Sequence, residues 1–170
     1  EPDRVATCLS ELRAVSDEWL ARRNSREKGF SLGHFDEAFI SRGRVGVVRV
    51  EGRIVAFATM WLAGKHAEAE VDLMRYSSAA PPSVMRYVIA ECMLWARSHG
   101  YSDFNLGMVP LSGIKTGSVA PLWNQIAGAV RVGGERYYNF RGLREFKEWF
   151  HPEWEPSYLV SPGGIRRPVI

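Results

Sequence analysis

The chain has 170 residues, of which 46% are hydrophobic and 24% are charged, which is ordinary for a soluble globular domain with a sizeable core. No apolar run approaches the roughly 20 residues of a membrane-spanning helix. Two cysteines in predicted helices indicate buried free thiols and exclude a disulfide framework, and no closely paired Cys/His set indicates a metal site.

The net charge of +3 is unevenly spread, with basic clusters at residues 22–28 and 131–147. Such clusters suit a polyanion or an anionic membrane surface, and a solvated face has the same composition. Because the first residue is Glu1 rather than methionine, we expect the chain to be a piece of a longer protein.

Apolar periodicity predicts a helix and a hairpin in the first part of the chain. Residues 5–23 repeat apolar side chains at three- and four-residue steps, as an amphipathic helix does. Residues 45–50 and 54–62 are apolar, β-branched runs, which predict two strands. The stretch 51–53, Glu-Gly-Arg, indicates a tight turn between them.

A third strand and the clearest helix of the sequence follow. The strand is predicted at 69–76, and the helix at 82–99, between a proline at its start and Gly100 after its end. Apolar side chains form two adjacent rows along this helix, which predicts that it packs against a sheet.

The last third of the sequence is rich in glycine, proline and aromatic residues. The remaining predicted elements are a strand at 103–109, a helix near 121–130, a strand at 137–140, a helix at 142–150 and a strand at 158–160. Residues 162–170 carry no pattern and are interpreted as a frayed tail. We find no repeat and no internal linker, so we expect a single domain over residues 1–170.

The order of these elements predicts an α/β (α+β) fold with a mixed, largely antiparallel central sheet flanked by helices. The same order is found in the GNAT acyltransferase fold. A ferredoxin-like sandwich fits less well, because three consecutive strands precede the long helix.

The turn at residues 76–83 does not have the chemistry of a coenzyme A site. GNAT enzymes that use acetyl-CoA hold its pyrophosphate on backbone N–H groups at a glycine-rich turn before the long helix. This turn contains no glycine, and Pro81 and Pro82 each remove an N–H donor. We therefore expect no coenzyme A and no other cofactor.

The third strand carries Glu68, Glu70 and Asp72 at alternate positions, which places them on one face. Arg75 would lie on the opposite face of a regular strand, so it can meet Asp72 only at a bulge or at the strand end. A carboxylate beside a guanidinium can orient an amine and a phosphate, or it can be a plain salt bridge.

Polar side chains follow the predicted strand 103–109. Asn105 lies in an otherwise apolar run and must be hydrogen-bonded, either as the cap of a loop or in a site. Ser112 and Lys115 lie in the glycine-rich loop beyond, and Lys115 is placed to reach a phosphate. The spacing of a phosphate-binding GxxxxGK[ST] loop is absent.

A second candidate surface lies between residues 136 and 154, where aromatic and basic residues alternate. Arg141, Arg144 and Lys147 are spaced three apart, so they share one face of the predicted helix. That face suits a phosphate group, and a solvated face is the alternative. The histidines have no serine or cysteine neighbours that would indicate a hydrolase triad.

Several blocks of sequence, in the same order, resemble the phosphatidylglycerol lysyltransferase (MprF) family. The matching blocks are Ser16-Asp17-Glu18-Trp19-Leu20, Glu27-Lys28-Gly29-Phe30-Ser31-Leu32-Gly33, Asp72-Leu73-Met74-Arg75-Tyr76, Phe104-Asn105-Leu106-Gly107-Met108, Pro110-Leu111-Ser112-Gly113, Tyr138-Asn139-Phe140, Gly142-Leu143-Arg144, Phe146-Lys147, Pro152-Glu153-Trp154-Glu155-Pro156 and Tyr158-Leu159. The resemblance extends from about Val15 to Leu159, and ordered blocks are more specific than any single motif.

The resemblance implies the second of two tandem GNAT-like halves at the cytosolic face of the bacterial inner membrane. It implies transfer of a lysyl or alanyl group from aminoacyl-tRNA to phosphatidylglycerol, which lowers envelope negative charge and protects against cationic antimicrobial peptides. It makes Asp72, Arg75 and Lys147 the expected catalytic residues. Asn105, Ser112, Lys115, Arg136, Asn139 and Arg144 are the expected substrate-binding residues.

Two other functions stay open at the level of sequence. One is a small-molecule N-acetyltransferase that uses coenzyme A, which binding of acetyl-CoA would favour. The other is a non-catalytic module that docks tRNA or lipid, which binding without turnover would favour. The implied partners are aminoacyl-tRNA, phosphatidylglycerol, and the N-terminal half-domain and membrane region of a longer protein. The sequence does not name the transferred amino acid.

Overall fold

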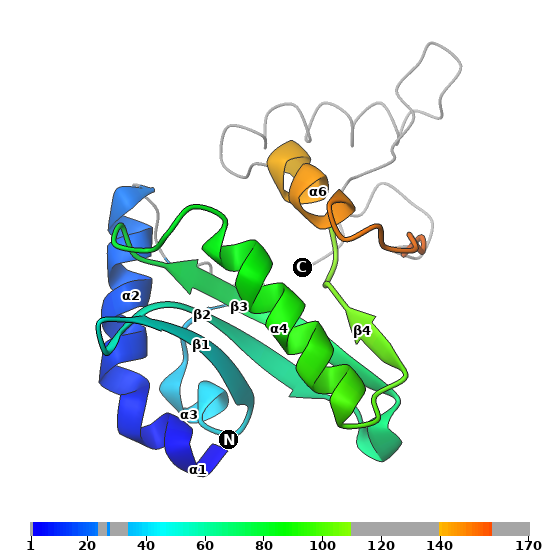
Figure 1. The fold of residues 1–170 in the computed structure, drawn as a ribbon, viewed down its shortest axis with the longest axis horizontal. Coiled ribbons are helices and arrows are strands. Elements are labelled where there is room, and N and C mark those ends of the chain that lie inside the picture. Colours follow the sequence, from blue (N-terminus) through cyan, green and yellow to red (C-terminus); the bar gives the residue numbers. More distant parts are fainter. Residues whose placement is uncertain (1, 24–26, 28–33, 110–139, 158–170) are drawn as a thin grey trace, which may run out of the picture. The chain divides into compact units, whose positions relative to one another are not determined.

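The computed structural model describes residues 2–23, 27, 34–109 and 140–157, within two compact units, Glu1–Met108 and Val109–Ile170 (Figure 1). The described part of the first unit contains a four-stranded sheet with helices on both faces. The described part of the second unit contains a helix followed by a segment without regular secondary structure. The predicted single domain stays a prediction, and its tail at 162–170 lies outside the described residues.

The sheet has the strand order β1-β2-β3-β4. The strands are β1 (Arg44–Val50), β2 (Arg53–Leu62), β3 (Glu68–Tyr76) and β4 (Asp103–Asn105). The first two pairs are antiparallel, and β4 pairs with β3 in parallel, which requires the helical crossover between them. The predicted mixed, largely antiparallel sheet is therefore confirmed.

The helices of the first unit are close to those predicted, with two short additions. They are α1 (Pro2–Val5), η1 (Ala6–Cys8), α2 (Leu9–Arg22), α3 (Glu37–Ile40), η2 (Gly64–His66) and α4 (Val84–Ser98). The predicted first helix is interrupted by the 3-10 turn η1. The helix α3 was not predicted, because its four residues are too short for a periodic pattern.

The β1–β2 hairpin follows from the chemistry of its two-residue loop. Glu51 and Gly52 both have positive φ angles, of 50° and 80°, and Val50 pairs with Arg53. Two central residues with positive φ define the turn whose twist matches that of the flanking strands, and glycine adopts this conformation without steric cost.

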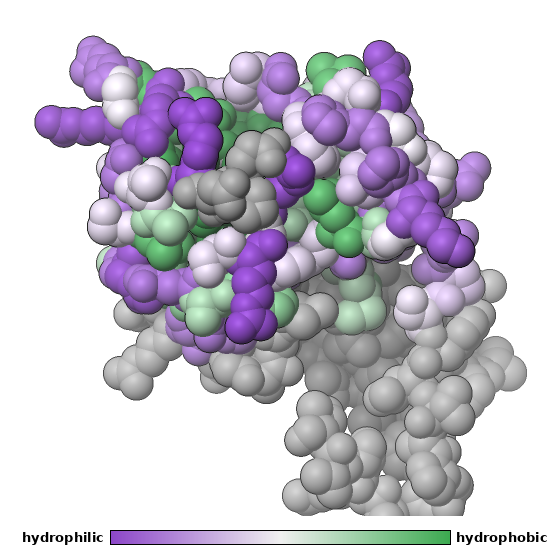
Figure 2. Space-filling view, turned by 90° about the horizontal axis from the view of Figure 1, so that it is seen from below, coloured by the Kyte–Doolittle hydropathy of each residue, from purple (hydrophilic) through white to green (hydrophobic). Residues whose placement is uncertain are grey.

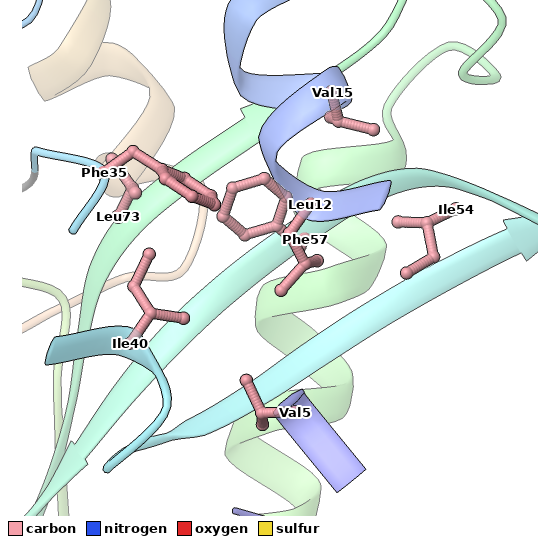
Figure 3. Packing of buried hydrophobic residues seen from close by; sticks show 8 residues of the cluster. All are labelled: Val5, Leu12, Val15, Phe35, Ile40, Ile54, Phe57 and Leu73. Atoms are coloured by element: carbon pink, nitrogen blue, oxygen red, sulfur yellow. The ribbon is translucent and has the colours of Figure 1, made fainter. Parts of the chain in front are cut away.

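The helices α2 and α4 cover opposite faces of the sheet (Figures 1 and 3). Phe57 on β2 belongs to a buried cluster that includes Leu12 and Val15 on α2. Gly46 on β1 faces the other way, towards Cys92 and Val88 on α4. We call these two sides of the sheet the α2 face and the α4 face.

The core on the α2 face is built around two phenylalanine rings (Figure 3). Phe57 is fully buried, and its ring meets that of Phe35 edge to face, with centroids 6.1 Å apart. The cluster consists of Val5, Leu12, Val15, Phe35, Ile40, Ile54, Phe57 and Leu73. Segments far apart in the chain therefore hold α2 and α3 on this face.

Two predicted strands need correction. The strand predicted at 103–109 ends at Asn105, because the Asn105 side-chain Oδ1 accepts a hydrogen bond of 2.7 Å from the Gly107 amide, and Gly107 has a φ of 75°. This local turn competes with the ladder. The strand predicted at 137–140 is wrong at Phe140, where helix α6 (Phe140–Glu148) begins. Residues 137–139 and the elements predicted near 121–130 and at 158–160 lie outside the described residues.

Tight packing between β1 and α4 gives a stability prediction. A Cβ at Gly46 would lie 2.9 Å from the Cys92 Sγ, so Gly46→Ala is expected to lower the free energy of unfolding by about 1–3 kcal/mol through overpacking. Urea denaturation measures this cost. Adding Cys92→Ala should recover part of it, since the clashing atom is then absent.

Gly64 provides the matched control, because a Cβ there meets no atom within 4 Å. Equal destabilisation by Gly46→Ala and Gly64→Ala would contradict the packing argument. The Cys92 thiol is itself buried, and this burial, with a smaller effect of Glu91, raises its pKa to about 11. Cys8 is half-buried, and neither cysteine is in a disulfide.

The surface seen from below is mainly hydrophilic, with small and separate hydrophobic patches (Figure 2). The exposed large hydrophobic side chains on α4 are Tyr87 and Leu94. Among the helices that the structure describes, none is both long and apolar enough to cross a membrane.

Candidate active site

An irregularity in β3 decides which side chains share the α2 face. Ala58 of β2 pairs with Met74, whereas Met60 pairs with Val71, so three steps along β3 are matched by two along β2. One extra residue is therefore inserted in β3, at Asp72–Leu73, opposite Thr59. This is a β-bulge, which changes the alternation of side chains along a strand.

Because of the bulge, the carboxylates of β3 and Arg75 lie on the same face of the sheet. Directly paired residues share a face, and the pairs here are Phe57 with Arg75 and Trp61 with Glu70. Phe57 and Trp61 are four residues apart on β2, so both face α2. Asp72, two residues beyond Glu70, therefore lies on the α2 face with Arg75.

Arg75 is a buried cation with specific partners. Its side chain is 6% exposed, its guanidinium carbon lies 3.9 Å above the centre of the Trp19 ring, and its Nη2 donates to the Glu27 carboxylate at 3.2 Å. Burying a charge is costly unless it is paired, and both an aromatic face and a carboxylate compensate it here. Its planar guanidinium group can donate hydrogen bonds to a phosphate at the position where it now meets the Glu27 carboxylate.

Two further arginines, at the end of α2, lie over aromatic rings near Arg75. Arg23 lies over the Trp19 ring at 4.4 Å, and Arg22 lies over the Tyr76 ring at 5.6 Å. Both are exposed, unlike Arg75. Part of the basic cluster predicted at 22–28 therefore lies beside Arg75, a proximity that sequence separation did not suggest.

Asp72 is oriented by an aromatic neighbour on β2. Its Oδ2 accepts a hydrogen bond of 3.3 Å from the Trp61 indole Nε1, and the Trp61 ring packs on Phe39 of α3 at 4.1 Å. The Asp72 side chain is half-buried. An anchored, partly accessible carboxylate on the same face as a guanidinium can bind an ammonium group or accept a proton.

The turn between β3 and α4 is occupied by a carboxylate of the protein. Glu18 Oε1 accepts a hydrogen bond of 2.7 Å from the Ser78 amide. This bond, followed by a hydrogen bond from the Ser78 side chain and a smaller attraction of Arg22, holds the pKa of Glu18 below its ordinary value. Ser83, which precedes α4, has a φ of 63° and makes no side-chain cap. An anion placed at this turn would meet the negative charge of Glu18.

This hydrogen bond predicts a pH-dependent contribution to stability. Since the pKa of Glu18 is lowered in the folded state, the contribution is present above the unfolded pKa and is lost as pH falls through the folded pKa. Glu18→Gln should lower the free energy of unfolding by about 0.5–1 kcal/mol at neutral pH, a charge-assisted bond discounted for solvent exposure. The difference should shrink below about pH 4.3.

Urea titrations of both proteins at pH 7 and near pH 3.5 measure this difference. The exposed neighbour Asp17, replaced by asparagine, is the control. If the deficit of Glu18→Gln were the same at both pH values, the ionised carboxylate would not be the cause.

The side-chain contacts of Asn105 are with Glu68 and Gly107, and they stabilise a local turn. Its side-chain nitrogen lies 3.4 Å from Glu68 Oε2, and its oxygen accepts from the Gly107 amide. On β4 it pairs with Glu70. The loop-capping role is therefore present, and a substrate-binding role stays a prediction.

In the second unit, α6 carries two of the predicted basic residues in different environments. Lys147 is buried, with 4% of its surface exposed. Arg144 is 40% exposed, forms an ion pair of 2.9 Å with Glu148, and lies 4.8 Å over the Trp154 ring. A lysine buried to this degree is unusual and is typically paired. Of the residues predicted here, Ser112, Lys115, Arg136 and Asn139 lie outside the described residues, as does the Arg141 side chain.

Sequence reasoning did not identify Glu18, Trp19, Glu27 or Trp61 as residues of this site. Trp19 was interpreted as part of the apolar row of a helix, and Glu18 and Glu27 were given no role in the site. The signal available was the grouping of Glu18-Trp19 and Glu27 in blocks that match one family. Among the described residues, no three His, Cys, Asp or Glu side chains gather as a metal site would require.

Comparison with a solved structure identifies the class of fold. The ribosomal-protein-alanine N-acetyltransferase of Brucella melitensis has a similar structure, with a TM-score of 0.52 over 93% of this chain and 94% of that chain, at 12% identity. This likeness shows the fold, which is the GNAT acyltransferase fold that the order of elements predicted.

The family follows from the sequence comparisons. The family model for "Phosphatidylglycerol lysyltransferase, C-terminal" matches residues 1–161. The phosphatidylglycerol lysyltransferase of Bacillus subtilis (strain 168) is 41% identical over 154 residues, which cover 89% of this chain and 18% of that protein. The chain belongs to this C-terminal family.

A solved relative agrees with this assignment. The C-terminal domain (DUF2156) of a protein named as a lysylphosphatidylglycerol synthetase, from Agrobacterium fabrum, matches with a TM-score of 0.74 at 43% identity. The match covers 92% of this chain and 46% of that chain. The chain therefore spans less than half of the solved domain and less than a fifth of the Bacillus subtilis relative.

Proposed function

We propose that this chain is the C-terminal part of a larger enzyme that transfers a lysyl or alanyl group from aminoacyl-tRNA to the glycerol hydroxyl of phosphatidylglycerol. The observation that carries the proposal is the buried Arg75 guanidinium, stacked on Trp19 and on the same sheet face as Asp72. Family membership supplies the reaction class, and this cluster supplies groups suited to it.

The reaction exchanges one ester for another. The glycerol hydroxyl attacks the carbonyl carbon of the aminoacyl ester, the bond to the tRNA ribose breaks, and the ribose oxygen leaves with a proton. We assign Asp72 to the aminoacyl amine or to the proton of the attacking hydroxyl. We assign Arg75 to a substrate phosphate, because its planar guanidinium group can donate two hydrogen bonds to the phosphate oxygens in a geometry that a lysine cannot provide.

Lys147 and Arg144, both on α6, are further candidates for binding substrate in this proposal. Lys147 is buried on α6, and we assign it to an anionic group of a substrate, because water screens the attraction between charges less at a buried position than at the surface. Arg144, beside Trp154, belongs with the anion-binding groups. Asn105, Ser112, Lys115, Arg136 and Asn139 complete the proposed substrate contacts.

The larger enzyme supplies what this chain does not span. We propose that an N-terminal half-domain and a membrane region complete it, and that the catalytic part works at the cytosolic face of the bacterial inner membrane. The physiological result is then a less negative envelope and resistance to cationic antimicrobial peptides. No cofactor is required, because the donor ester is already activated.

The turn before α4 favours this function over acetyl transfer from coenzyme A. Ser78 donates its amide to Glu18 at 2.7 Å, and Pro81 and Pro82 lack amide protons. A pyrophosphate would have to displace a carboxylate and would find few donors. A docking module without catalysis is the other alternative, and only turnover separates it from the proposal.

The test is transfer of labelled lysine or alanine from charged tRNA to phosphatidylglycerol vesicles by the full-length protein, with calorimetry of acetyl-CoA in parallel. Labelled lipid without heat from acetyl-CoA supports the proposal. Saturable acetyl-CoA binding without lipid labelling would replace it with the acetyltransferase. Binding of tRNA or lipid with no labelled product would leave a docking module.

A further inference from the structure

In the bulge that brings Asp72 to the α2 face, a backbone amide is hydrogen-bonded to a side chain and not to the backbone of the neighbouring strand. The Leu73 amide, which lies within the bulge, donates a hydrogen bond of 2.9 Å to the Thr59 Oγ1. In a regular strand this amide would meet a backbone carbonyl of the neighbouring strand. Thr59 therefore supplies the acceptor for this amide at the point where the register between β2 and β3 changes.

Both partners of this hydrogen bond are buried. Thr59 is 2% exposed and Leu73 is 4% exposed, so water has little access to the amide. A buried N–H group without an acceptor is costly, and β3 can relieve that cost only by moving. By accepting a hydrogen bond from the Leu73 amide, Thr59 therefore stabilises the bulge in β3.

The bulge also fixes where the candidate site residues point. Arg75 faces α2 because it pairs with Phe57, and Asp72 reaches the same face only because one residue is inserted between the two registers. A one-residue slip of a strand turns its side chains to the other face. If the insertion were lost, Asp72 and Arg75 would lie on opposite faces, as in a regular strand.

We propose that Thr59 is a positioning residue of the active site, which acts by holding the β3 bulge and thereby the Asp72 carboxylate relative to Arg75. The inference rests on the proposed function for the roles of Asp72 and Arg75. It goes beyond that function by assigning a residue that does not itself meet the substrate, on a different strand and 13 positions earlier in the chain.

Trp61 reports the position of Asp72 without any substrate. Its indole Nε1 donates to Asp72 Oδ2, and it lies two residues beyond Thr59 on β2. The ¹⁵N–¹H resonance of this indole, identified by its loss in Trp61→Phe, shifts when the hydrogen bond to Asp72 is lengthened or broken.

The experiment compares three replacements of Thr59. Thr59→Val keeps the shape but removes the acceptor, whereas Thr59→Ser and Thr59→Ala both remove the methyl group and differ only in the hydroxyl. In the full-length protein we expect Thr59→Val and Thr59→Ala to lower kcat for aminoacyl transfer by roughly tenfold or more, since misplaced catalytic groups lose rate steeply. Thr59→Ser should stay within about threefold of the wild-type kcat, because the serine hydroxyl still accepts from the Leu73 amide and the missing methyl group costs mainly stability.

The indole resonance is measured on the 170-residue chain. It should move in Thr59→Val and Thr59→Ala and stay in place in Thr59→Ser. The comparison of serine with alanine still decides if Thr59→Val does not fold, because these two variants carry the same packing defect.

Several results would overturn the inference. One is a wild-type kcat in folded Thr59→Val or Thr59→Ala, and another is a Trp61 indole resonance that stays in place in these variants. A third is an equal loss of kcat in Thr59→Ser and Thr59→Ala, which would indicate a packing role alone. A wild-type protein that labels no lipid contradicts the proposed function instead, and the indole resonance then still tests whether Thr59 holds Asp72.

Discussion

Replacing Arg75 by lysine is expected to lower aminoacyl transfer by at least about tenfold, which corresponds to about 1.4 kcal/mol on the barrier. Lysine keeps the charge but loses the planar fork that meets Glu27 and the flat surface that lies on Trp19 at 3.9 Å. The measurement is the rate of labelled lipid formation by the full-length protein, with folding checked by thermal denaturation.

Arg23 is a matched control, because it also lies over the Trp19 ring, at 4.4 Å, but is exposed. Arg23→Lys is expected to keep the rate within about twofold, since exposed charges with water access contribute little. If Arg75→Lys folds and transfers normally, the buried guanidinium is only structural, and the proposed role of the cluster fails.

Replacing Phe57 by alanine is expected to have the largest effect on stability, a loss of about 3–5 kcal/mol in the free energy of unfolding. Phe57 is fully buried between the sheet and α2, and its ring packs edge to face on Phe35 (Figure 3). Since a domain is stable by only about 5–15 kcal/mol, this loss is a large share of the total. Urea denaturation followed by circular dichroism measures it.

Tyr87 serves as the control because it is an aromatic residue that is 57% exposed on α4. Tyr87→Ala should change the free energy of unfolding by no more than about 0.5 kcal/mol, as surface substitutions usually do. Comparable losses in both variants would show that burial on the α2 face does not dominate the stability of this unit.

Local sequence patterns were sufficient for the regular elements of the first unit. Periodicity found α2 and α4, and the Glu-Gly turn at 51–52 located the β1–β2 hairpin, because these features depend on residues close together in the chain. The order of elements then predicted the GNAT fold. Where a local side chain competed with the ladder, at Asn105, the predicted strand was too long.

The candidate site was only partly predictable. Asp72 and Arg75 were identified as a pair that needs a bulge to share a face, and the structure contains that bulge. Its position depends on pairing with β2 and on the Thr59 hydroxyl, neither of which has a sequence pattern. Trp19 lay among the apolar positions of the predicted helix at 5–23, and an apolar row on a helix does not show which member lies under a cation.

Composition, periodicity and ordered blocks of sequence predicted the class of fold and the family, because these features can be recognised along the chain without knowledge of its folding. The contact of Glu27 with Arg75, 48 positions apart, and the place of Glu18 at the turn before α4 were visible only in the folded chain. Contacts of this kind depend on how strands register and helices pack, and a one-residue change in register reverses which face a side chain occupies.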